Sequence, residues 1–132
     1  MEINRRKLLA GSAAVAAVPC FDSLLLAGDV PEAKVPEGAV IVLAQLKAKP
    51  GEEKAVREAL VAMVKPTRKE KGCICYNLHQ SQSDPTQFMF YEQWKDKETL
   101  DAHGKTAHMK AMQAGIKGRI EKGGATFFNL IG

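Results

Sequence analysis

Three histidines supply the side chains best suited to proton transfer: His79, His103 and His108. Imidazole has an unperturbed pKa close to neutrality, so each histidine could act as a general base on a weakly acidic substrate. His103 ends one predicted helix and His108 lies near the start of the next, where hydrogen bonding to a helix end is an alternative explanation. His79 lies near the end of a predicted strand and could equally face solvent. The sequence therefore offers three candidate bases.

A second group of side chains could hold a planar substrate. Phe90 and Trp94 lie on one face of an alternating segment and would form an apolar wall for a ring, although an aromatic stripe on a strand also suits a protein core. Glu92 shares that face and is either a buried carboxylate with a raised pKa or an edge residue paired with a lysine. Three polar side chains could form hydrogen bonds to substrate oxygens: Tyr76, Asn77 and Tyr91.

The sequence gives little support for metal or nucleic-acid binding. The three histidines lie on different predicted elements, and the spacing of five between His103 and His108 fits no compact ligand motif, so no metal is predicted. The formal net charge is +4, but no basic cluster is interleaved with aromatic residues. Cys73 and Cys75 are two apart on a predicted strand, so both thiols are expected on one face as small buried side chains.

The elements that must position these residues follow from the hydrophobic period. Residues 39–48 are nearly all apolar and predict a buried strand, and the pattern from Glu52 predicts an amphipathic helix that weakens near Pro66. Residues 73–81 and 87–94 alternate around the turn formers Ser83, Asp84 and Pro85, which predicts a β-hairpin. Two helical stretches follow, over 95–103 and after Gly104, and a last strand is expected over 125–131.

The expected order is β-α-β-β-α-β, the α+β arrangement called ferredoxin-like, in which helices cover one face of an antiparallel sheet. The other face is then left open. A small sheet with an apolar face in water invites association, so two copies are expected to pack their sheets together as a homodimer.

The N-terminal residues are typical of an export signal. Arg5, Arg6 and Lys7 precede a weakly apolar run rich in Ala and Gly, which favours the twin-arginine route to the periplasm. That run is too short for a stable membrane anchor, which takes roughly 20 apolar residues. We expect a signal segment over 1–27, a linker with two prolines over 28–38 and one folded domain over 39–132.

Five blocks of the sequence resemble the antibiotic biosynthesis monooxygenase family, in particular its quinol monooxygenases. The blocks are Gly72-Cys-Ile-Cys-Tyr-Asn-Leu-His79, Asp84-Pro85, Phe90-Tyr-Glu-Gln-Trp94, Leu100-Asp-Ala-His103 and Thr106-Ala-His-Met-Lys110. The resemblance runs from about Val40 to Leu130. It implies a dimeric α/β-barrel, a pocket between sheet and helices in each subunit, and oxygenation of electron-rich aromatic substrates by O2 without metal, flavin or haem.

Three other functions remain open. Haem-degrading relatives of the same fold use an asparagine on the first strand, where this chain has only Ala44 or Gln45. A small-metabolite isomerase of the same superfamily could use the same histidines to move protons without consuming oxygen. A non-catalytic dimer could hold a small aromatic molecule without converting it.

Overall fold

The first strand and first helix follow the predicted pattern closely. The structure, a computed structural model, describes residues 35–131; the expected signal segment lies outside the described residues, as does the expected linker up to residue 34. Strand β1 spans Val40–Ala48, and helix α1 spans Glu53–Thr67 with a buried apolar face. Pro66 lies in the last turn of α1, and the helix ends one residue later. Proline disfavours a longer helix here because it has no backbone N–H to donate.

A β-hairpin follows, as predicted. Strand β2 spans Cys73–Gln80 and strand β3 spans Gln87–Trp94. The register shifts between Cys73 and Cys75, so that Cys73 pairs with Trp94 while Cys75 pairs with Gln93. Cys73 packs against the core cluster. The expectation that both thiols share one face is therefore wrong, because this irregularity inserts a residue and breaks the alternation.

The C-terminal part holds two short helices and a strand. Helix α2 spans Lys97–His103, helix α3 spans Ala107–Ile116 and strand β4 spans Ile120–Asn129. The last strand begins five residues earlier than predicted, because Gly123 and Gly124 lie inside it and the chain turns instead at Gly118, with φ of 76°. A Cβ on Gly123 would lie 3.3 Å from the Gln45 carbonyl oxygen, so glycine permits a close approach of β4 to β1.

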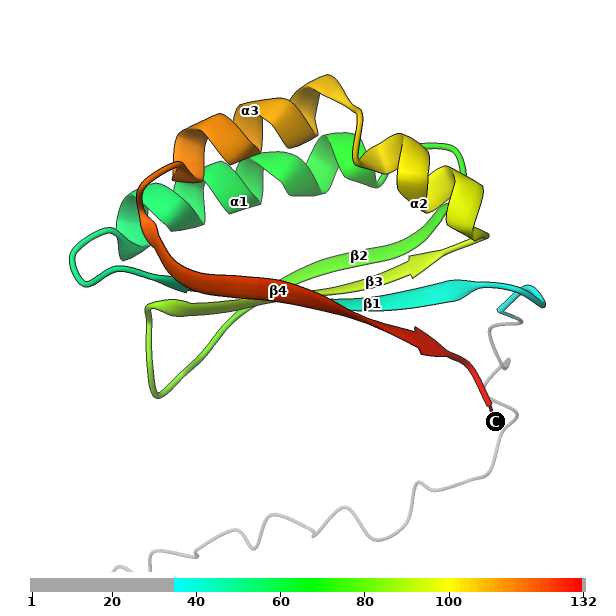
Figure 1. The fold of residues 1–132 in the computed structure, drawn as a ribbon, viewed down its shortest axis with the longest axis horizontal. Helices are drawn as coiled ribbons and strands as arrows, with labels where there is room; N and C mark the ends of the chain where they lie inside the picture. The colour runs from blue at the N-terminus through cyan, green and yellow to red at the C-terminus, as the bar shows by residue number, and fades with distance from the viewer. Residues whose placement is uncertain (1–34, 132) are drawn as a thin grey trace, which may run out of the picture. The chain divides into compact units, whose positions relative to one another are not determined.

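The four strands form one antiparallel sheet in the order β2-β3-β1-β4. All three helices cover the same face of this sheet, with α3 beside α1 (Figure 1). The α+β ferredoxin-like prediction is confirmed, with the second helical region divided into α2 and α3.

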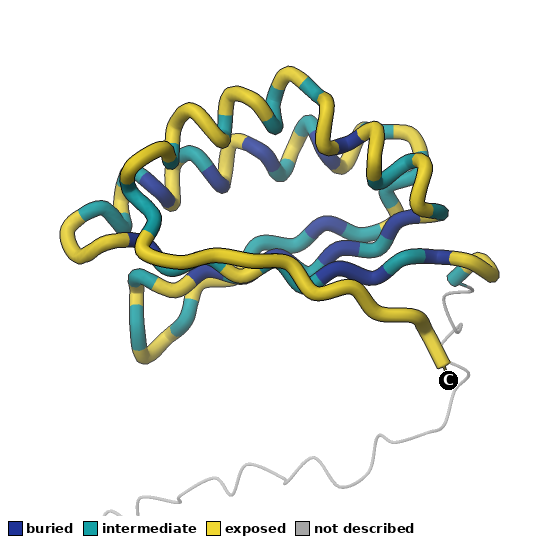
Figure 2. The backbone as a smooth tube through the Cα atoms, in the orientation of Figure 1, coloured by how far each residue is buried: buried dark blue, intermediate teal, exposed yellow. Residues whose placement is uncertain are grey.

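The core lies between the helices and the sheet. Val42, Phe90 and Trp94 are buried beneath the helices together with the apolar face of α1. Strand β4 stays exposed along nearly its whole length (Figure 2). The opposite face of the sheet, called the open face below, carries Leu43 and Met89 without a covering helix. Within residues 35–131, no helix is both long and apolar enough to span a membrane.

Candidate active site

The turn between α2 and α3 brings two of the predicted histidines together. His103 ends α2, and the Thr106 amide and hydroxyl both donate to its carbonyl oxygen, at 3.1 Å and 2.9 Å. Thr106 is also the N-cap of α3, where its hydroxyl oxygen accepts a hydrogen bond from the Met109 amide at 3.3 Å. His108 lies in the first turn of α3, so this compact turn places the two imidazole centroids 6.0 Å apart.

A carboxylate from a third segment joins the two imidazoles. Glu70 lies in the turn between α1 and β2, and its Oε1 is 2.8 Å from Nδ1 of His103 and 2.5 Å from Nε2 of His108. The exposed fraction of the side chain is 14% for Glu70, 3% for His103 and 24% for His108. Sequence reasoning missed Glu70, because it lies between two lysines in a run that resembles a solvated turn.

The contact with Glu70 selects the tautomer of His103. A carboxylate only accepts hydrogen bonds, so Nδ1 must carry the proton, and in the neutral ring Nε2 then holds the free lone pair. Nε2 is buried and has no hydrogen-bond partner among the described residues. This arrangement orients an imidazole as a base, and the carboxylate would stabilise the imidazolium that forms after proton transfer.

Aromatic rings hold His103 in place. The centroid of Trp94 lies 4.7 Å from that of His103, and Tyr76 contacts the imidazole in an edge arrangement at 5.6 Å. Tyr76 in turn packs on Phe90 at 4.8 Å. Burial raises the pKa of the Tyr76 phenol above its ordinary value, so this ring stays protonated. The three aromatic rings are all buried and form the packed support for His103: Tyr76, Phe90 and Trp94.

Glu92 is a buried carboxyl group beside this cluster. The indole Nε1 of Trp94 donates to its Oε2 at 2.8 Å, and only 5% of the residue is exposed. Burial raises the pKa of Glu92, while the hydrogen bond from Trp94 and the nearby His103 oppose that shift. Of the two possibilities that the sequence left open, the buried carboxylate is the one found.

His103 and Glu92 both line a cavity of 540 Å³ between the sheet and α2. Most of its wall is apolar, with Val42 from β1, Leu100 from α2 and Phe127 from β4. Lys97 and Asp101 also line it, and they form an exposed ion pair with each other at 2.8 Å. A cavity of this size, with few polar groups on an apolar lining, suits a small aromatic molecule.

The remaining predicted residues lie on the open face. The strand register places Asn77, His79 and Tyr91 there, on the side of the sheet opposite to the cavity that holds His103 and Glu92. Asn77 accepts a hydrogen bond from Arg68 at 2.8 Å, and the Tyr91 hydroxyl accepts one from Gln93 at 2.7 Å. The structure therefore separates the predicted site residues into two groups.

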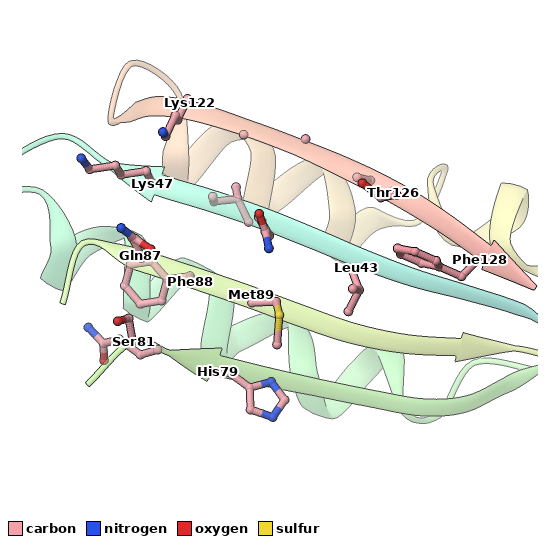
Figure 3. Close-up of a pocket in the computed structure, with 16 residues that line it drawn as sticks. Leu43, Lys47, His79, Ser81, Gln87, Phe88, Met89, Lys122, Thr126 and Phe128 are labelled. Carbon is pink, nitrogen blue, oxygen red and sulfur yellow. The ribbon is translucent and has the colours of Figure 1, made fainter. Parts of the chain in front are cut away.

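A larger cavity of 790 Å³ lies on the open face and is lined in part by His79 (Figure 3). Leu43, Met89 and Phe128 contribute apolar side chains, and Lys122 projects near one end. His79 has no ion pair with a carboxylate among the described residues. The smaller cavity is the better candidate for chemistry, because its histidine is oriented by a carboxylate and faces a second titratable group.

Comparison with known proteins identifies a family that this chain matches. The model of a family described as "Antibiotic biosynthesis monooxygenase" matches residues 39–115. The protein "Probable quinol monooxygenase YgiN" of Escherichia coli is 29% identical over 89 residues, covering 60% of this chain and 86% of its own length. Rv0793 of Mycobacterium tuberculosis is 35% identical over 69 residues, covering 52% of this chain and 67% of that protein.

Other relatives extend the comparison. An uncharacterized protein of Synechocystis is 30% identical over 83 residues, covering 63% of this chain, and this chain spans only 54% of its length. The crystal structure of PA3566 from Pseudomonas aeruginosa has a TM-score of 0.69 and 29% identity, covering 72% of this chain and 96% of that one. The likeness therefore extends through the βαββααβ domain.

Proposed function

Because the chain belongs to the antibiotic biosynthesis monooxygenase family, we propose that it is a cofactor-independent monooxygenase that oxidises quinol-like or anthrone-like aromatic substrates with O2. The observation that carries this proposal is the orientation of His103, which lines an apolar cavity while its Nδ1 donates to Glu70. The Escherichia coli relative carries the description "Probable quinol monooxygenase", which supports the substrate class.

The proposed reaction begins with proton transfer. His103 removes a proton from a phenolic hydroxyl or from the carbon beside a carbonyl group, and the resulting anion is electron-rich enough to transfer electrons to O2. One oxygen atom enters the substrate and the other leaves as water, so a quinol yields a hydroxyquinone and an anthrone yields an anthraquinone. Glu70 stabilises the imidazolium of His103, as a carboxylate does in other oriented histidine pairs.

Two other residues have proposed roles. Glu92 lines the cavity, where its carboxyl group accepts a hydrogen bond from a substrate hydroxyl. His108 contacts the same oxygen of Glu70 as His103 does and acts as a positioning residue.

Oxygen uptake by the full chain tests this function. Quinols and anthrones are supplied with a chelator present, and each rate is compared with the spontaneous oxidation of the same compound. We expect a saturable rate in the wild type and in His79→Gln, and a loss of about a hundredfold or more in His103→Gln, the usual contribution of a general base. The His79 variant is the matched control, because it places the same substitution on the open face.

One outcome would reject the role of His103, and two others would reject the oxygenase. Equal rates in the His103 and His79 variants would remove His103 from the reaction. Proton exchange of a carbonyl metabolite with solvent, without oxygen uptake, would indicate an isomerase that uses the pair His103 and Glu92. Saturable binding of an aromatic compound without either reaction would indicate a binding protein.

We also propose that the chain forms a homodimer through the open face. Leu43, Met89 and Phe128 line the groove there, and Phe128 is 44% exposed. An apolar sheet face of this kind is stabilised when a second copy covers it. Light scattering during gel filtration should give twice the chain mass for the wild type and a lower mass for Phe128→Asp. A monomeric wild type would reject the dimer.

A further inference from the structure

The contacts of Glu70 also describe a set of metal ligands. Glu70, His103 and His108 come from three separate segments, and one ligand atom of each lies within 4.8 Å of the other two. Among residues 35–131, the only ion-pair partners of Glu70 are these two histidines. When both imidazoles are neutral, this mostly buried carboxylate therefore faces no full positive charge.

From this geometry we propose that Glu70, His103 and His108 bind a divalent transition-metal ion of the Zn²⁺ class. Two neutral imidazoles and one carboxylate form a donor set that suits Zn²⁺, whereas Mg²⁺ and Ca²⁺ prefer oxygen ligands alone. Three protein ligands leave a further coordination position for water. The ion supplies the positive charge that the Glu70 carboxylate does not meet when both imidazoles are neutral.

Only small side-chain movements are needed. Zn²⁺ lies about 2.0–2.2 Å from its nitrogen and oxygen ligands. The ion would therefore replace the two hydrogen bonds between Glu70 and the imidazoles, with the three donor atoms arranged around it. His103 is fixed by its contact with Trp94. His108 is partly exposed and lies in the first turn of α3, so its ring can rotate toward the ion.

Metal binding has a consequence for the base. Nδ1 of His103 would ligate the ion in place of its hydrogen bond to Glu70, and the proton of a neutral imidazole would then lie on Nε2. In that form His103 accepts no proton, so the ion inhibits the reaction. This inhibitory role rests on the proposed oxygenase, whereas metal binding itself does not.

Equilibrium dialysis against Zn²⁺ tests the site directly. The full chain, without an affinity tag, is compared with Glu70→Gln, His108→Gln and the matched control His79→Gln, and bound zinc is measured by elemental analysis. All four proteins keep the same cysteines, so zinc held by thiols is equal in each. Circular dichroism confirms that each variant is folded.

We expect one Zn²⁺ per chain in the wild type and the His79 variant, with affinity at least about tenfold weaker in the Glu70 and His108 variants. Equal affinity in all four proteins, or no zinc bound by the folded wild type, would overturn the site. If quinol oxidation is observed, one equivalent of Zn²⁺ should abolish it in the wild type. An unchanged rate with zinc bound would overturn the inhibitory role alone, and the absence of any oxidation would reject the oxygenase while leaving the dialysis result intact.

Discussion

Gly72→Ala tests how the candidate site is held together. Gly72 has φ of 87°, and a Cβ at this position would lie 2.4 Å from Cγ2, 2.6 Å from Cβ and 2.7 Å from Oγ1 of Thr99. Thr99 and His103 are four residues apart in α2 and therefore share one helix face. The close approach of Gly72 to Thr99 thus sets the distance between α2 and the turn that carries Glu70.

Two costs add in this variant. An L-residue with a side chain costs roughly 1–2 kcal/mol in the left-handed region. Forcing a methyl group into a filled space costs about 1–3 kcal/mol. Rotation of the Thr99 side chain can move Cγ2 and Oγ1 but not Cβ, so the second cost is not removed by a rotamer change. We expect Gly72→Ala to lower the free energy of unfolding by roughly 2–5 kcal/mol.

Urea unfolding of four proteins separates the two costs. In a Thr99→Gly background the steric contact is absent, so Gly72→Ala should there cost only the roughly 1–2 kcal/mol of its backbone conformation. The difference between the two backgrounds, about 1 kcal/mol or more, is the coupling energy. A Gly72→Ala variant within about 0.5 kcal/mol of the wild type, or no coupling to Thr99, would refute this reasoning.

Three further predictions concern single residues. Burial raises the pKa of Glu92 above its ordinary 4.5. The contribution of Glu92 to stability is therefore fully present below pH 4.5 and is lost as the pH rises through the folded-state pKa. Urea unfolding should show the wild type losing up to about 1.4 kcal/mol per pH unit in that window, and Glu92→Gln losing less. Burial raises the pKa of the Cys73 thiol to about 11. In a variant whose other cysteines are serine, Cys73 should therefore react with a disulfide reagent at pH 8 roughly a hundredfold more slowly than a free thiol. A rate close to that of the free thiol would contradict this prediction. Thr106→Ala removes the acceptor for the Met109 amide and should lower the free energy of unfolding by about 1 kcal/mol, whereas Thr106→Ser should retain it, and equal losses in both would reject the cap.

Most of the fold could be predicted because its elements have clear periods. The alternation in β3 and the helical spacing in α1 each identify one buried face. The two errors have different causes, a close backbone approach in one case and a register irregularity in the other. Gly123 resembles a turn residue, but it lies inside β4 near the Gln45 carbonyl, and the irregularity after Cys73 has no sequence pattern that distinguishes it from regular alternation.

The candidate site could be predicted only in part. His103 and His108 were identified by type and lie together in the structure, but the sequence also proposed His79, which the sheet separates from them. The sequence left Trp94 open between a substrate wall and a core residue, and in the structure it lies buried beneath His103 and donates to Glu92. Residue type identifies candidates for chemistry, whereas strand register and helix docking decide which side of the sheet they occupy.

Glu70 shows why topology, and not local sequence, assembles this site. It lies 33 residues before His103 and 38 before His108, and neither spacing corresponds to a helix or strand period. The connection is made by the sheet. The end of α1 leads into β2, and the amide of Lys95, after β3, donates to the Gly72 carbonyl oxygen at 2.8 Å, so the turn before β2 lies beside the start of α2. A βαββαβ order read from the sequence therefore implies that a carboxylate just after the first helix can reach the histidine at the end of the second.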